Sequence, residues 1–110
     1  MPSTDGFVGT IEVETRNVSR VWFSLTAERA GSDWVRIGNA RAWFTMNLET
    51  GDRPHQLAKL TLLMEAMRNG LAIRVSHDAA ADFQKFNPND SFEVDGVRIL
   101  RDGLSRQCYN

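Results

Sequence analysis

The fold is decided by residues 41–75, which read RAWFTMNLETGDRPHQLAKLTLLMEAMRNGLAIRV. Side chains alternate between apolar and polar over residues 41–48, and this pattern predicts a β-strand. Asp52 suits the N-cap of a helix, and Gly70 suits the position just after its C-terminal end. The apolar residues 71–75 follow at once and predict another strand. This stretch therefore predicts a strand, a helix and a strand in immediate succession.

The predicted helix carries one apolar stripe. Pro54 fits its first turn, where the missing N–H group costs no hydrogen bond. The stripe recurs at helical spacing and consists of Leu57, Leu60, Leu63, Met64 and Met67. Leu62 lies on the other side of the helix and is expected to be exposed. The residues expected to cap one open end of the strand assembly are Leu57, Leu60, Met64 and Met67.

Two alternating segments precede this stretch. Residues 7–15 and 20–27 each place apolar side chains on one face and polar side chains on the other, which predicts two half-buried strands. Gly9 suits a β-bulge, where the first strand must bend. Residues 34–37 are a candidate for a brief extra strand. The third main strand, residues 41–48, follows.

The C-terminal part contains one more predicted strand, residues 97–100. Two arrangements remain open for Phe92 and Val94. They either extend this strand or pair with it across a hairpin turn at Asp95 and Gly96. In both cases the main elements follow the order β-β-β-α-β-β.

This order in a chain of 110 residues favours a mainly β fold with one helix, a five-stranded OB-like Greek-key β-barrel. We expect a single domain over residues 1–110, structured over about residues 7–101 with loose termini. An open α+β sheet with the helix across one face is the alternative, because periodicity does not distinguish the two. The expected core consists of Ile11, Val13, Val21, Phe23, Leu25, Phe44, Met46, Ile73, Val75, Val97 and Ile99.

The composition is ordinary for a globular domain, with 42% hydrophobic and 25% charged residues. The net charge of −1 argues against a general nucleic-acid binder, because phosphate neutralisation requires a basic excess. The single cysteine, Cys108, excludes an intrachain disulfide. Residues 1–6 lack the character of a signal peptide, and no apolar run approaches the length of a membrane span. We therefore expect a cytoplasmic protein, with the mature form of a secreted protein as the alternative.

No catalytic constellation is recognisable in the sequence. His55 and His77 have no cysteine or carboxylate at metal-ligand spacing around them. The glycines form no phosphate-binding motif, and no nucleophile elbow is present. We therefore expect no enzyme activity, no metal site and no cofactor.

The second and third main strands carry tryptophan and arginine on the face turned away from the predicted core. In an OB barrel this face is the usual ligand surface. Aromatic side chains stack on bases or sugars, and arginine adds cation–π contacts and anion recognition. The candidate binding residues are Arg20, Trp22, Trp34, Arg41 and Trp43, with Phe83, Lys85 and Phe86 from the loop before the last strand.

Three interpretations of this Trp/Arg face remain open. Residues 28–40 are long enough to fold over the tryptophans and form a second small core. The face is equally compatible with a protein interface, since exposed apolar patches often mark partner sites. The third interpretation is a platform for a small ligand.

Residues 41–47, 56–67 and 69–75 together resemble the bacterial OB-fold family that includes the binding subunits of AB5 toxins. In that family a strand with aromatic residues leads into a helix, and a short glycine-containing turn connects the helix to the next strand. The resemblance covers about residues 8–100 and implies the OB-fold. Its members form pentameric rings whose helices line a pore, and their outer surfaces bind glycans. We assign neither the ring nor the sugar-binding residues to this chain.

We therefore expect a non-catalytic bacterial binding domain that recognises a glycan or a protein partner through the Trp/Arg face. One alternative is a protein–protein interaction module with no small ligand. The other is a single-stranded nucleic-acid-binding OB domain, which the net charge of −1 makes the less favoured partner class. The oligomeric state stays open, with a monomer favoured over a pentamer.

Overall fold

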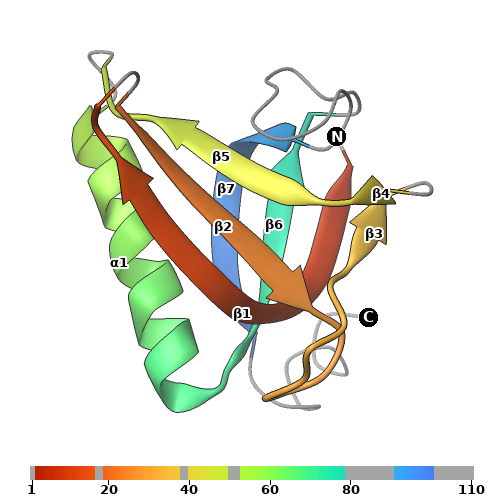
Figure 1. The fold of residues 1–110 in the computed structure, drawn as a ribbon. Helices are drawn as coiled ribbons and strands as arrows, with labels where there is room; N and C mark the ends of the chain where they lie inside the picture. The colour runs from red at the N-terminus through yellow and green to blue at the C-terminus, as the bar shows by residue number, and fades with distance from the viewer. Residues whose placement is uncertain (1, 17–18, 38–39, 50–52, 79–90, 101–110) are drawn as a thin grey trace.

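The computed structural model describes residues 2–16, 19–37, 40–49, 53–78 and 91–100. These residues form a mainly β structure with one helix (Figure 1). Strand β1 begins at Ser3 and not at Phe7, because its N-terminal part pairs with a later strand. In chain order the elements are β1 (Ser3–Glu14), β2 (Arg20–Thr26), β3 (Arg36–Ile37), β4 (Ala40–Arg41), β5 (Trp43–Asn47), α1 (Arg53–Asn69), β6 (Ala72–His77) and β7 (Ser91–Leu100).

Five of the strands form one sheet that closes on itself. Neighbouring strands follow the order β1-β2-β5-β7-β6, and β6 pairs again with β1. All of these pairs are antiparallel except β5 with β7, which run parallel. Figure 1 shows β1 curving across the front of the molecule, so that its two halves reach β6 and β2. The predicted mainly β fold, with five strands and one helix, is confirmed, and the open-sheet alternative is wrong.

A bulge in β1 decides which of its side chains face the core. The register between β1 and β2 shifts between Val8 and Thr10, so the bulge predicted at Gly9 is confirmed. A Cβ atom at Gly9 would lie 2.9 Å from Cγ2 of Thr26, which leaves no room for a side chain. Val8 is buried, whereas Val13 is 50% exposed. The prediction that Val13 belongs to the core is wrong, because the C-terminal half of β1 has a strand neighbour on one side only.

The hydrophobic core lies inside the closed sheet. Phe23 and Phe44 stack there with ring centroids 5.4 Å apart. Three predicted core residues, Ile11, Val97 and Ile99, are partly buried and pack against the core from its edge. The predicted core residues that are fully or almost fully buried are Val21, Phe23, Leu25, Phe44, Met46, Ile73 and Val75.

Helix α1 packs against β1, β5 and β7, but with a different face from the predicted one. Its buried residues are Gln56, Leu63 and Ala66. The small side chain of Ala66 allows close approach to the sheet, and this rotates the apolar stripe to one flank of the helix. Leu60 is partly buried, and the exposed residues are Leu62, as predicted, together with Leu57, Met64 and Met67. The prediction that Leu57, Met64 and Met67 cap the sheet is therefore wrong.

The helix ends as predicted. Gly70 follows α1 with a φ of 64°, in the left-handed region that favours glycine. The Nε–H of Arg29 donates a hydrogen bond to the carbonyl oxygen of Gly70 at 2.7 Å. A Cβ atom at Gly70 would lie 3.1 Å from Cδ of Arg29. Backbone strain and this neighbour both favour glycine here. The predicted N-cap, Asp52, lies outside the described residues.

Strand β7 is continuous through Asp95 and Gly96. The hairpin alternative for these two residues is wrong, and Phe92 and Val94 extend the strand. The reason is long-range pairing. Residues 91–93 at the start of β7 pair with β5, and residues 94–100 pair with β6, with a register shift between Ser76 and His77.

Candidate functional site

A short hairpin presents tryptophan and arginine on one face of the molecule. Strands β3 and β4 are antiparallel, with Arg36 opposite Arg41. The N–H of Ala42 donates to the carbonyl oxygen of Val35 at 3.2 Å, so the same register continues toward the sheet. One further step along this register brings Trp34 opposite Trp43. Because side chains alternate along a strand, both tryptophans and both arginines share one face of this segment, which we call the Trp/Arg hairpin (Trp34, Arg36, Arg41 and Trp43).

The two tryptophans of the hairpin are in direct contact. The ring centroids of Trp34 and Trp43 are 4.8 Å apart, with an interplanar angle of 85°. This edge-to-face arrangement is a favourable one for aromatic pairs. The guanidinium carbon of Arg41 lies 5.8 Å from the ring centroid of Trp34, within cation–π distance. Both tryptophans are only partly buried, so the cluster offers indole surface to an external molecule.

The backbone holds the hairpin against the main sheet. Trp34 forms an isolated bridge with Thr26 at the end of β2. The N–H of Val35 donates to the carbonyl oxygen of Leu25 at 2.9 Å. On the other side, Trp43 begins β5 and pairs with Ser24 of β2. The tryptophan pair is therefore anchored to the closed sheet at both of its strands, which limits its freedom before any ligand arrives.

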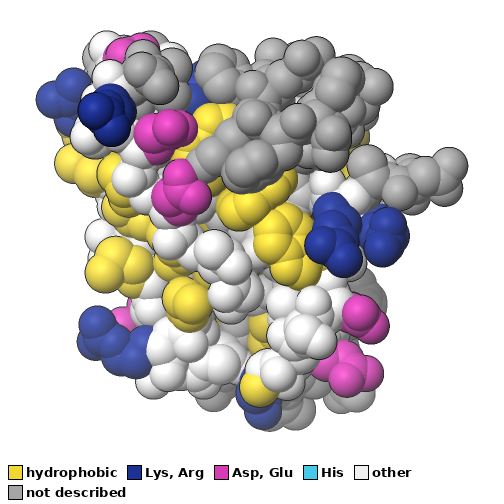
Figure 2. Space-filling model, in the orientation of Figure 1, with side chains coloured by type: hydrophobic (Ala, Val, Ile, Leu, Met, Phe, Trp, Pro, Cys, Tyr) yellow, Lys and Arg dark blue, Asp and Glu magenta, His cyan; other side chains and the backbone are white. Residues whose placement is uncertain are grey.

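The hairpin concentrates positive charge. Arg36 and Arg41 are both exposed and directly opposite each other. The two guanidinium groups offer charged hydrogen-bond donors to an anionic ligand. Figure 2 shows Lys and Arg side chains beside hydrophobic ones on the side of the molecule where β3 and β4 lie.

Two of the predicted site residues, Trp22 and Arg20, do not join this exposed cluster. Trp22 is 1% exposed, and its Nε1–H donates to Oε1 of Glu14 at 3.2 Å. Arg20 forms a salt bridge of 2.8 Å with Glu93 and donates to Oγ1 of Thr45 at 2.9 Å. Both side chains have polar partners within the protein, from β1, β5 and β7. The structure thus divides the predicted face into a buried part and the exposed Trp/Arg hairpin.

The remaining predicted residues, Phe83, Lys85 and Phe86, lie outside the described part of the chain. Arg36 is the hairpin residue that we did not select from the sequence. The short strand predicted at residues 34–37 could have indicated Arg36, because a hairpin between this strand and the next one would place Arg36 opposite Arg41.

His77 has a structural role. It is 2% exposed and lies between Phe44 and Phe92, with a centroid distance of 5.4 Å to each ring. Its Nδ1 lies 2.7 Å from the carbonyl oxygen of Asp78, which only accepts, so Nδ1 carries the proton. Its Nε2 lies 2.8 Å from the hydroxyl oxygen of Thr4. Across the described ranges no group of three or more His, Cys, Asp or Glu side chains is arranged to hold a metal ion.

Two comparisons with known proteins found no match. No family model matches the chain, and no curated protein matches it. Within the described residues, α1 and any other helical segment fall short of the length and hydropathy needed to span a bilayer. Functional interpretation therefore depends on the geometry of the Trp/Arg hairpin.

Proposed function

We propose that this chain is a non-catalytic binding domain that recognises a glycan through the Trp/Arg hairpin. The observation that carries the proposal is the contact between two partly exposed tryptophans, Trp34 and Trp43, with Arg41 beside them. Indole rings bind the apolar faces of sugar rings, and guanidinium groups donate paired hydrogen bonds to carboxylate or sulfate groups of acidic sugars. The hairpin supplies both kinds of contact on one surface.

The strand order supports the same function. We propose that the closed sheet is an OB-like Greek-key barrel, because its order β1-β2-β5-β7-β6 combines one parallel pair, β5 with β7, with a helix between β5 and β6, the third and fourth of these strands in chain order. Barrels of this class commonly bind oligosaccharides or oligonucleotides. The resemblance to the binding subunits of AB5 toxins belongs to this proposal as a likeness of fold.

A panel of immobilised neutral and acidic glycans tests the proposal. We expect selective binding by the wild-type chain. The variant with Trp34→Thr and Trp43→Thr should bind about tenfold more weakly or worse, because each stacking contact contributes about 1–3 kcal/mol. Arg41→Gln removes the neighbouring charge while leaving both indoles in place, and it should weaken binding of acidic glycans more than of neutral ones.

Leu62→Thr is the matched control, since it removes an exposed apolar side chain from α1 instead of the hairpin. It should bind like the wild type. The proposal fails if no glycan binds, or if the double tryptophan variant binds as tightly as the control while circular dichroism shows that both are folded.

A single-stranded oligonucleotide is the second candidate ligand, and the opposed pair Arg36 and Arg41 beside two indoles favours it. Bases stack on indole rings, and phosphates pair with arginine. Titration of tryptophan fluorescence with an oligothymidylate at low salt tests this candidate, because electrostatic affinity is greatest there. An unchanged spectrum would exclude it.

A further inference from the structure

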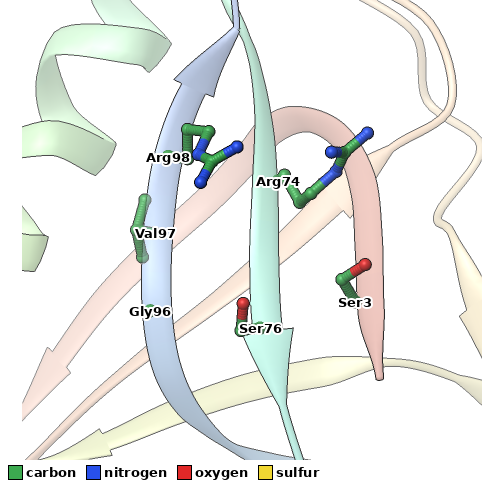
Figure 3. A pocket seen from close by; sticks show the side chains of 6 residues that line it. All are labelled: Ser3, Arg74, Ser76, Gly96, Val97 and Arg98. Atoms are coloured by element: carbon green, nitrogen blue, oxygen red, sulfur yellow. The ribbon is translucent and has the colours of Figure 1, made fainter. Parts of the chain in front are cut away.

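We propose that a second site, a groove on the outer face of β1, β6 and β7, binds a small phosphate monoester. The groove is lined by Ser3, Arg74, Ser76, Gly96, Val97 and Arg98 and encloses about 370 Å³ (Figure 3). None of these residues belongs to the Trp/Arg hairpin. The inference therefore does not depend on the proposed glycan function.

Strand register arranges the groove as two parallel rows. In the first row Ser3 pairs with Ser76, and Ser76 pairs with Gly96. These are small residues that carry two hydroxyl groups and leave a depression in the surface. A Cβ atom at Gly96 would meet only the side chain of Ser76, at 3.7 Å or more, so the space above Gly96 is open.

The second row carries the charge. Asp5 pairs with Arg74, and Arg74 pairs with Arg98. Arg74 donates two hydrogen bonds to the carboxylate of Asp5, of 2.8 Å from Nε and 3.1 Å from an Nη atom. The row contains one carboxylate and two guanidinium groups, which gives it one positive charge in excess. These long side chains form a wall along the depression.

The contact with Asp5 occupies two hydrogen-bond donors of Arg74. The hydrogen bond and the charge of Asp5 raise the pKa of Arg74 above its ordinary value. The same pairing fixes the direction of its guanidinium group. Arg98 is exposed and forms no salt bridge with the residues that the structure describes.

Figure 3 shows where the side chains point. The guanidinium group of Arg74 reaches from β6 toward β1, where Asp5 pairs with it. The guanidinium group of Arg98 reaches from β7 toward β6, and the hydroxyl groups of Ser3 and Ser76 point toward the arginine row. Hydroxyl and guanidinium donors together suit the tetrahedral oxygens of a phosphate group. The single excess charge and the small volume favour a phosphate monoester over a polyanion, since a nucleic-acid backbone requires several cations along its path.

The experiment titrates the protein with inorganic phosphate and monitors the backbone amide signals by NMR. Sodium chloride keeps the ionic strength constant. We expect saturable shifts at Ser3, Ser76 and Gly96. Arg98→Gln should raise the dissociation constant about tenfold, because it removes a charged hydrogen-bond donor. Arg68→Gln is the matched control, since it removes an exposed arginine from the last turn of α1, outside both proposed sites, and it should leave the dissociation constant unchanged.

Gly96→Val separates loss of the site from loss of the fold. Its side chain fills the depression without a close backbone contact, and a β-branched residue suits a strand better than glycine does. We expect it to abolish phosphate binding while thermal stability stays equal or rises. Wild-type affinity in Gly96→Val or Arg98→Gln, or the absence of saturable shifts in the wild type, would overturn the proposal.

Two further probes identify the source of the phosphate. Ribose 5-phosphate should bind in the groove at least as well as inorganic phosphate, because its dianionic monoester keeps the same group. An oligothymidylate carries only diesters and should bind there more weakly per phosphate. Preferential binding of the oligonucleotide to this groove would overturn the assignment to a small monoester.

Discussion

The three tryptophans of this chain occupy different environments, and this difference predicts their energetic roles. Trp22 is 1% exposed and hydrogen-bonded to Glu14, so Trp22→Ala should lower the free energy of unfolding by about 3–5 kcal/mol. Trp34→Ala should cost only about 1 kcal/mol, mainly the contact with Trp43. Urea denaturation measures both values. Equal costs for the two variants would show that Trp22 is not part of the interior.

The ion pair of Arg20 and Glu93 supplies a second prediction for single residues. Glu93→Gln removes the charge that faces the almost buried Arg20 and should lower the free energy of unfolding by about 2 kcal/mol, below the range for fully buried pairs because Glu93 is partly exposed. Adding Arg20→Met should recover part of that loss, because it removes the charge that Glu93 faced. A double-mutant cycle with purely additive effects would contradict this description of the pair.

At the scale of the elements, two substitutions test which face of helix α1 packs against the sheet. Leu63→Ala should cost about 2–5 kcal/mol, since Leu63 is fully buried. Met64→Ala should change the free energy of unfolding by about 0.5 kcal/mol or less, because Met64 is 49% exposed. Denaturant unfolding of the two variants distinguishes the faces. A large loss for Met64→Ala alone would restore the face predicted from the sequence.

Local sequence patterns determine where helix α1 ends, but they do not determine which of its faces packs against the sheet. The ends of α1 follow from local chemistry, and Gly70 was predicted for that reason. The rotation of the helix was not predictable, because the stripe from Leu57 to Met67 is wider than the contact and the polar Gln56 lies within the buried line. Packing against three strands selected among the possible faces, and helical periodicity contains no information about that choice.

At the scale of the whole molecule, the number and order of main elements followed from the sequence. A closed sheet was favoured from that order alone, because hydrophobic periodicity does not distinguish it from an open one. Closure depends on the pairing of β1 with β6, between residues about seventy positions apart in the chain, such as Ser3 and Ser76. The candidate site, too, was predictable only in part. Alternation identified the outward Trp/Arg positions, whereas the burial of Trp22 and the inclusion of Arg36 depended on tertiary contacts.

The proposed binding surface is tested most directly by the indole N–H signals of the three tryptophans in a ¹H–¹⁵N spectrum. The titrant is the tightest oligosaccharide from the glycan panel. We predict that the signals of Trp34 and Trp43 shift in a saturable manner with a common dissociation constant, while the signal of Trp22 stays in place because its N–H group is held by Glu14. A shift confined to Trp22, or no saturable shift of Trp34 and Trp43, would contradict recognition through the Trp/Arg hairpin.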